Sequence, residues 1–285
     1  MSTVEVYLQA CKLVGVVPVS YFIRNLDSTT MSLTHHGLGP LGCKALAIAL
    51  VVNFCIQTDM HIDTLELADN DIQAEGAKYL GELFKANFTI QHLVCRSTKL
   101  PLEGRSSIEN ALVSVLFQDL SNNYLQSAGA EYVAKMLLAN NEGVEVLDLS
   151  WNQLRMKGAV AFCAGLKVNM MLKHLDLSWN GFGNEGALAM GEALKFNNTV
   201  VFLNLNNNRI TNEGVSMLCR GLEFNDTLRV LLVGELDFII FTFFLYTKDY
   251  LDQRKLRLWD FFRNIDKDGT MHVPVADFRK AIQVK

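Results

Sequence analysis

The sequence predicts an α/β fold, a solenoid of stacked strand–turn–helix units, and two repeated features carry this prediction. A block of the form LxLxxN returns at nearly fixed spacing, so that Asn152, Asn180 and Asn208 are each 28 residues apart. A glycine follows the last position of the block by six residues in all seven copies, at Gly42, Gly76, Gly104, Gly129, Gly158, Gly186 and Gly214. Self-similarity at a fixed period of this length is typical of repeat architectures.

Each unit contains two periodicities. The alternation in LxL, as in Leu175 and Leu177, is typical of a short strand with one buried face, whereas Gly186, Met190 and Leu194 follow the spacing of an amphipathic helix. One unit cannot bury its own apolar face, so neighbouring units stack. Parallel strands lie about 4.8 Å apart and helices pack at about 8 to 10 Å. This mismatch predicts a horseshoe with strands on the concave face and helices on the convex face.

The last position of the block, here called the Asn position, has an expected structural role. It falls at residues 36, 70, 98, 123, 152, 180 and 208. A side-chain amide both donates and accepts hydrogen bonds, so it can satisfy the backbone of a turn that is buried between neighbouring units. The copies at His36 and Thr98 lack the Asn, and the copy ending at Asn123 has Gln118 in place of its first Leu.

Two intervals between Asn positions depart from 28 or 29 residues. The first, from 36 to 70, is 34 residues long, and we expect its insertion around Cys55 to His61 to form a surface loop. The third, from 98 to 123, has only 25 residues. We expect a shortened or distorted helix over Ile108 to Gln118 and a local break in the strand ladder.

The changes in pattern along the chain predict four segments. Residues 1–26 form a helical cap, with one helix to Gly15, a turn at Pro18 and a second helical piece through Asn25. Residues 27–235 contain about eight repeats, of which the third is shortened. Residues 236–249 are an apolar cap or linker, and residues 250–285 are a charged amphipathic helical pair.

The repeats resemble leucine-rich repeats of the ribonuclease-inhibitor-like kind, whose alternating 28- and 29-residue units match these spacings. This resemblance implies a leucine-rich-repeat horseshoe. The segment from Phe262 to Phe278, with its DKDG and VADF sequences, resembles one EF-hand. The combination is similar to the leucine-rich repeat-containing protein 74 group, which implies an architecture more than an activity.

The calcium chemistry of the EF-hand-like segment fits poorly. The residues that would supply ligands are Asp266, Asp268, Thr270 and Asp277. Met271 stands at the sixth loop position, where a Gly normally takes positive φ, and Asp277 replaces the longer bidentate Glu of the twelfth. We therefore expect no response to Ca²⁺ and no cofactor.

Composition and motifs argue against several classes of function. The 26 Lys and Arg against 30 Asp and Glu give a net charge of −4, which provides no electrostatic footprint for nucleic acid. The longest dense apolar run, Leu236 to Tyr246, would make a helix of only about 16 Å, too short to span a membrane. The six Cys form no CxxC pair and the N-terminus lacks a basic n-region, so we expect a cytoplasmic protein with reduced thiols. Since no zinc template, GxSxG or Walker loop occurs, we expect no enzyme activity.

The strand residues that lie between the buried leucines are the candidates for recognition on the concave face. They combine carboxylates, aromatic rings and amides, namely Glu66, Asp119, Asp148, Trp151, His174, Asp176, Trp179, Phe202 and Asn204. Aromatic anchors beside a carboxylate row favour a protein or peptide partner of basic character, and so an interaction scaffold or adaptor. The alternative is a dedicated enzyme regulator, for which the resemblance suggests a ribonuclease-inhibitor-like inhibitor or a Ran-type GTPase activator. A third interpretation gives these side chains no partner, with Asp simply solvated and Trp packed at the strand edge. Oligomeric state stays open.

Overall fold

The computed structural model describes residues 2–56, 62–99, 115–139, 143–222, 224–235 and 238–244. Its helices are α1 (Thr3–Val14), α2 (Ser20–Arg24), α3 (Gly39–Ile56), α4 (Gln73–Ala86), α6 (Gln126–Ala139), α7 (Lys157–Leu166), α8 (Gly183–Leu194) and α9 (Asn212–Leu222). Its strands are β1 (Thr30–Ser32), β2 (Thr64–Glu66), β3 (His92–Val94), β4 (Phe117–Asp119), β5 (Val146–Asp148), β6 (His174–Asp176), β7 (Phe202–Asn204), β8 (Val230–Glu235) and β9 (Phe238–Phe244).

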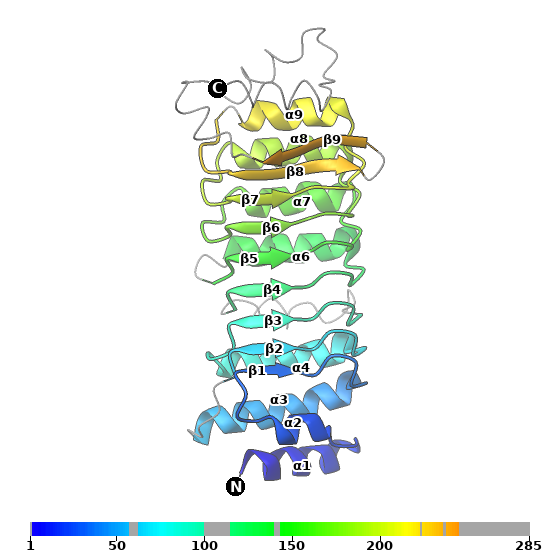
Figure 1. Ribbon diagram of the computed structural model, residues 1–285, viewed down its shortest axis with the longest axis vertical. Helices are drawn as coiled ribbons and strands as arrows, with labels where there is room; N and C mark the ends of the chain where they lie inside the picture. The colour runs from blue at the N-terminus through cyan, green and yellow to red at the C-terminus, as the bar shows by residue number, and fades with distance from the viewer. Residues whose placement is uncertain are drawn as a thin grey trace.

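The strands form one sheet in sequence order, with the helices stacked behind it along the same long axis (Figure 1). Strands β1 to β8 are parallel and keep one register, in which Leu147, Leu175 and Leu203 are direct partners. Strand β8 continues this register one repeat further, with Leu231 opposite Leu203. The expected α/β solenoid, with strands on one face and helices on the other, is confirmed.

The core is a continuous apolar layer between sheet and helices. The central residue of each of the strands β1 to β7 points into it, and Leu147, Leu175 and Leu203 are at most 1% exposed. Burying one such side chain stabilises the fold by about 1.5 to 3 kcal/mol. The outer residues of the same strands therefore remain on the opposite face of the sheet, available to a partner.

A ladder of buried amides joins the repeats at the Asn position, as expected. The Asn180 Oδ1 atom accepts hydrogen bonds from the backbone N–H groups of Asn152 (2.9 Å) and Leu154 (3.2 Å) in the preceding repeat. Its Nδ2 atom donates to the carbonyls of Leu149 at 2.8 Å and Leu177 at 3.0 Å. Asn208 makes the corresponding bonds to Asn180 and Phe182, so each turn depends on the next repeat.

A second amide ladder runs along the opposite edge, after the helices. The Nδ2 atom of Asn197 donates to the carbonyls of Leu166 and Asn169 in the preceding repeat, at 2.8 and 2.9 Å. Its Oδ1 atom accepts from the backbone N–H groups of Thr199 and Val200. Both ends of strands β6 and β7 are thus fixed by buried side-chain amides.

Close helix packing explains the glycine at the start of helix α7. A Cβ atom added to Gly158 would lie 2.5 Å from the Cα of Ser127, which lies in the first turn of helix α6. Within the same pair of helices, a Cβ at Gly165 would lie 2.6 Å from the carbonyl oxygen of Ala134. Only glycine permits this approach between α6 and α7.

The strand ladder is not broken at the short third interval, so that expectation was wrong. Strands β3 and β4 pair in the common register, with Leu93 opposite Gln118, and the Oδ1 atom of Asn123 accepts a 3.0 Å bond from the Thr98 backbone N–H. Since these contacts fix the strands and the turn after them, the missing residues do not disturb the sheet. Residues 100–114, which contain most of the short interval, lie outside the described residues.

The insertion in the first interval also differs from the expected surface loop at its start. Helix α3 continues through Cys55 to Ile56 and reaches 18 residues, because its sequence is apolar and free of Pro or Gly after Gly42. Residues 57–61 lie outside the described residues.

The first strand is preceded by helices that coincide with the two helical segments expected there. Helix α1 starts with a capping box between Ser2 and Glu5 and ends at Gly15, which takes φ +75°. Tyr7 on α1 packs against Phe22 on α2 with ring centroids 4.5 Å apart. At the other end, β9 falls in the segment expected to be an apolar cap or linker and pairs antiparallel with β8.

Candidate protein-binding surface

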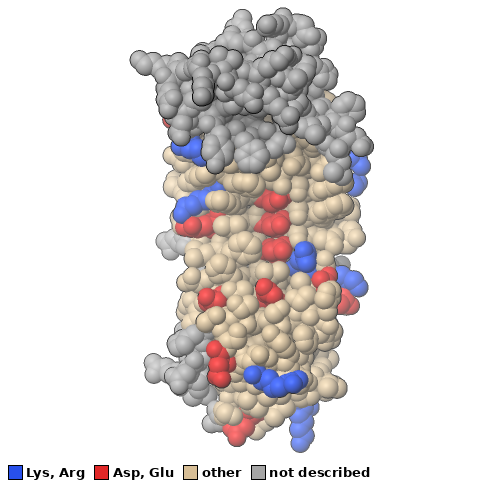
Figure 2. Space-filling view, in the orientation of Figure 1, with Lys and Arg blue, Asp and Glu red and all other residues tan. Residues whose placement is uncertain are grey.

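The outward residues of the strands line up in columns across the sheet. The third residues of β4 to β7, Asp119, Asp148, Asp176 and Asn204, are consecutive partners in the register. Acidic side chains accordingly form a line along the middle of the strand face (Figure 2). Glu66 on β2 stands in the same column but is separated from Asp119 by Val94. The expected carboxylate row therefore consists of three adjacent residues and one distant one.

Hydrogen bonds hold the three adjacent carboxylates in place. Asp148 accepts a 2.8 Å bond from the backbone N–H of Ser150, and Asp176 accepts a 2.7 Å bond from the Nδ2 of Asn204. Burial is the main cause that raises the pKa of Asp148, and the charges of Asp176 and Asp119 on either side raise it further. The row is thus a preorganised site of negative potential.

Aromatic rings form a parallel column at the first residue of the strands. His174 and Phe202, both expected here, stack with centroids 5.8 Å apart and an interplanar angle of 13°. The structure adds a second pair, His92 and Phe117, stacked at 5.7 Å and 19°. The sequence analysis did not include this second pair. This pair could have been predicted from the sequence, because both residues directly precede the buried central position of their strands.

Trp151 and Trp179 stack where the chain leaves strands β5 and β6. Their ring centroids are 4.2 Å apart, the planes are within 11° of parallel, and Trp151 is 50% exposed. Both residues take a positive φ of 59°, which the turn imposes just before the Asn position. Trp151 is therefore exposed and Trp179 partly exposed, with one ring packed on the other.

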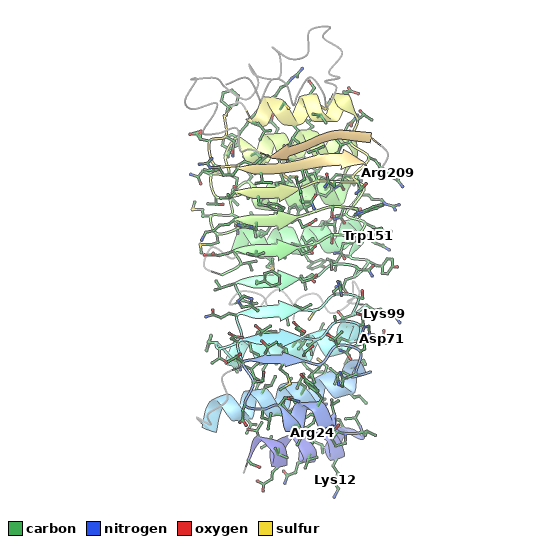
Figure 3. All side chains as sticks on the ribbon, viewed as in Figure 1. Lys12, Arg24, Asp71, Lys99, Trp151 and Arg209 are labelled. Carbon is green, nitrogen blue, oxygen red and sulfur yellow. The ribbon has the colours of Figure 1, made fainter. Side chains whose placement is uncertain are left out.

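Charged side chains follow the same edge of the solenoid, one residue after the Asn position. Asp71 and Lys99 occupy this place in adjacent repeats and form a 3.1 Å ion pair, and Arg209 occupies it further along the edge (Figure 3). The bond from Lys99 lowers the pKa of Asp71. Within the described residues, neither Arg209 nor Arg155 has such an acidic partner.

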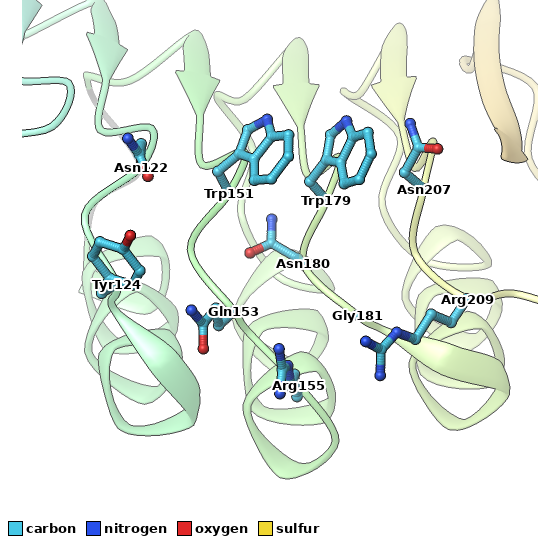
Figure 4. Close-up of a pocket in the computed structure, with 10 residues that line it drawn as sticks. All are labelled: Asn122, Tyr124, Trp151, Gln153, Arg155, Trp179, Asn180, Gly181, Asn207 and Arg209. Carbon is cyan, nitrogen blue, oxygen red and sulfur yellow. The ribbon is translucent and has the colours of Figure 1, made fainter. Parts of the chain in front are cut away.

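A pocket of about 560 Å³ lies at this edge, beside the tryptophan pair (Figure 4). Its lining combines aromatic rings, amides and two guanidinium groups, from Asn122, Tyr124, Trp151, Gln153, Arg155, Trp179, Asn180, Gly181, Asn207 and Arg209. None of these residues is acidic. Of the lining residues, only the two tryptophans were predicted from the sequence as binding residues. The hollow also depends on residues one or three positions beyond the regular block, such as Gln153, Arg209 and Arg155.

The described residues contain neither a metal cluster nor a membrane-spanning helix. No group of three His, Cys, Asp or Glu side chains in this part of the chain could hold a metal ion. No helix of the same part is both long and apolar enough to cross a membrane. The EF-hand-like candidates Asp266, Asp268, Thr270 and Asp277 lie outside the described residues.

Comparison with known proteins supports the repeat architecture. A family model described as leucine-rich repeat matches residues 58–81, 140–163, 168–191 and 196–219. The leucine-rich repeat-containing protein LegL7 of Legionella pneumophila has a similar structure, with a TM-score of 0.52, 18% identity, and coverage of 80% of this chain and 70% of LegL7. The fold is therefore an α/β leucine-rich-repeat solenoid.

Two curated relatives match parts of the sequence. Protein CARMIL of Dictyostelium discoideum is 28% identical over 155 residues, which are 52% of this chain and 13% of that protein. Human leucine-rich repeat-containing protein 74B is 45% identical over 47 residues, 16% of this chain and 12% of the relative. The chain thus spans about an eighth of the length of either relative.

Proposed function

We propose that this leucine-rich-repeat solenoid is an intracellular interaction scaffold that binds a basic segment of a protein partner on its strand face. The observation that carries the proposal is the contiguous row of Asp119, Asp148 and Asp176, set beside stacked aromatic rings. Solenoids use their strand faces as extended binding surfaces. Binding of this kind requires no cofactor.

Electrostatics favour a cationic group above the row. Neighbouring strands lie about 4.8 Å apart, so three carboxylates in one column repel one another. An arginine or lysine of a partner would relieve this repulsion, and it would favour the ionised form of Asp148, whose pKa burial and its neighbours raise. The exposed ring of Trp151 adds a surface for cation–π contact or for an apolar anchor.

The relatives support the proposal through architecture alone. CARMIL and leucine-rich repeat-containing protein 74B match short parts of their length, and LegL7 shares the fold. The buried thiols of Cys43, Cys95 and Cys163 suit a reducing, intracellular setting.

A peptide-binding experiment tests the role of the row. The probe is a fluorescein-labelled peptide of alternating arginine and glycine, and its affinity is measured by fluorescence polarisation. The variant Asp148→Asn/Asp176→Asn keeps acceptor oxygens for the local backbone while removing two charges. Because each partly exposed ion pair is worth about 0.5 kcal/mol, we expect about fivefold weaker binding.

The matched control removes two charges from the helix side. Glu131 on α6 and Glu185 on α8 are exposed, so Glu131→Gln/Glu185→Gln removes the same amount of negative charge but far from the row. We expect a change of less than about twofold, since salt screens distant charges. Equal affinities of the two double variants would refute the proposal that the strand face binds the basic segment.

Affinity purification of the tagged full chain then addresses what kind of partner is bound. Partners that the wild type retains and Asp148→Asn/Asp176→Asn loses bind the strand face. Recovery of one enzyme at near-stoichiometric amount would identify a dedicated enzyme regulator, whereas several weaker partners are expected of a scaffold.

A further inference from the structure

We propose that the pocket beside Gly181 binds a carboxylate of the same partner, from an Asp or Glu side chain next to an apolar residue. This inference rests on the proposed function and adds to it the chemistry of a second contact. The partner segment would then carry both kinds of charge, with a basic side chain over the row of Asp148 and Asp176 and an acidic side chain in the pocket.

Charge is the first argument. Among the described residues, the pocket lining contains Arg155 and Arg209 and no acidic residue, although the whole chain carries a net charge of −4. Both side chains are exposed, and neither forms an ion pair within the described residues. A carboxylate placed between two guanidinium groups can accept paired, charge-assisted hydrogen bonds from either of them.

The same edge shows how the fold neutralises such charges elsewhere. Two repeats at the start of the solenoid carry opposite charges one residue after the Asn position, and Asp71 there pairs with Lys99 at 3.1 Å. Arg209 occupies the equivalent place, but its neighbour one repeat earlier is Gly181, which has no side chain. Among the residues that the structure describes, none supplies Arg209 with the anion that Asp71 supplies to Lys99, and a partner can supply it.

Shape is the second argument. The equivalent residues Gln153 and Arg209 carry long side chains at positive φ, whereas Gly181, at φ +72°, leaves the space between them open. A Cβ atom added to Gly181 would lie 3.2 Å from the Cγ of Arg155, so that side chain borders the hollow. The Arg209 guanidinium group extends toward Arg155 (Figure 4), and the Nε atom of Arg155 would lie 3.5 Å from a Cβ on Gly181.

The aromatic side of the pocket defines the residue next to the carboxylate. Trp151 and Tyr124 are 50% and 57% exposed and provide flat apolar surface beside Gln153. An apolar or aromatic side chain of the partner would cover this surface. A nucleic acid fits less well than a peptide, because its phosphates would also lie near the adjacent row of carboxylates.

Tryptophan resonances provide a site-specific test on the full chain. The sequence contains only Trp151, Trp179 and Trp259, so a heteronuclear spectrum shows three indole N–H signals. The probes are the capped dipeptides acetyl-Phe-Glu-amide, acetyl-Phe-Gln-amide and acetyl-Phe-Lys-amide. We expect the Glu probe to shift the indoles of Trp151 and Trp179 and to bind about fivefold more tightly than the Gln probe.

Two variants test which residues produce this preference. Arg155→Gln/Arg209→Gln should remove the difference between the Glu and Gln probes. Gly181→Gln should weaken every probe by filling the hollow, and the fold should accept it because Gln153 adopts the same backbone conformation one repeat earlier. Unchanged circular dichroism spectra verify that both variants are folded.

Several outcomes would overturn the inference. These are equal binding of the Glu and Gln probes, tighter binding of the Lys probe, or a Glu preference that survives Arg155→Gln/Arg209→Gln. Larger indole shifts with inorganic phosphate or an oligothymidylate than with the Glu probe would assign the pocket to phosphate chemistry instead. Asp148→Asn/Asp176→Asn separates the two proposals, since it should weaken the arginine–glycine peptide while leaving the Glu preference intact.

Discussion

Replacing Asn180 by alanine should be among the most destabilising single changes in the solenoid. The side-chain Oδ1 atom is the acceptor for the buried backbone N–H groups of Asn152 and Leu154. The carbonyls of Leu149 and Leu177 keep a second amide donor, from Asn152 and Asn208, after the change. The loss therefore falls on two N–H groups, and at about 1 to 3 kcal/mol for each unsatisfied group we expect a fall of about 4 kcal/mol in the free energy of unfolding.

Urea unfolding followed by circular dichroism measures this loss, with the slope of the transition checked for constancy. The control is Asn198→Ala, at an exposed residue in the same repeat, which should change stability by less than about 0.5 kcal/mol. Asn180→Thr should fall between them, because Thr98 occupies the equivalent place and donates a 2.8 Å bond to the Cys95 carbonyl. A loss below about 1 kcal/mol for Asn180→Ala would refute the view that the amide ladder holds the repeats together.

Three further predictions concern the carboxylate row, the fourth strand and the core thiols. Folding raises the pKa of Asp148, so the folded protein binds a proton at this carboxyl group more tightly than the unfolded chain does. Ionisation of Asp148 therefore lowers the free energy of unfolding as pH rises through the folded-state pKa. Asp148→Asn should thus raise the free energy of unfolding at neutral pH by up to about 1 kcal/mol, with no gain in acid, and urea titration showing a loss at neutral pH would contradict this. Gln118→Leu restores the apolar residue that the neighbouring strands have at this position, so it should raise the free energy of unfolding by about 1 kcal/mol and raise the melting temperature. A melting temperature below that of the wild type would contradict this prediction. Burial raises the pKa of the Cys43 thiol to about 12 and that of Cys163 further, so both should resist iodoacetamide until denaturant is added; mass spectrometry showing fast native labelling would disprove their burial.

Residues whose place is set by repeat geometry could be predicted from the sequence. The alternation around Leu175 buries that residue and turns His174 and Asp176 to the outer face. A constant register then brings equivalent residues together, which explains why Trp151 and Trp179 stack. The fold and the columns of the strand face follow from these two rules.

The pocket residues, whose role depends on the absence of a side chain in one repeat, could not be predicted in the same way. The pocket exists because Gly181 lacks the side chain that Gln153 and Arg209 have, and the repeat pattern leaves this position unconstrained. The unbroken pairing of β3 with β4 was missed for a related reason. The spacing along the chain shows that residues are missing from this repeat, but it does not show whether they are missing from the strand side or from the rest of the unit. The hydrogen bond from the Thr98 backbone N–H to Asn123 keeps the turn after β3 in its usual place, so the strand side is unchanged.

The two amide ladders fix the backbone of the repeats through buried side chains, such as Asn197 and Asn208. The outward residues of the same strands, such as Asp148 and Asp176, make few of the bonds that hold neighbouring repeats together. Folding and recognition are consequently encoded in separate residues of one short block. The outward residues of the strand face can therefore be substituted one repeat at a time, by mutation or by design, without changing the fold.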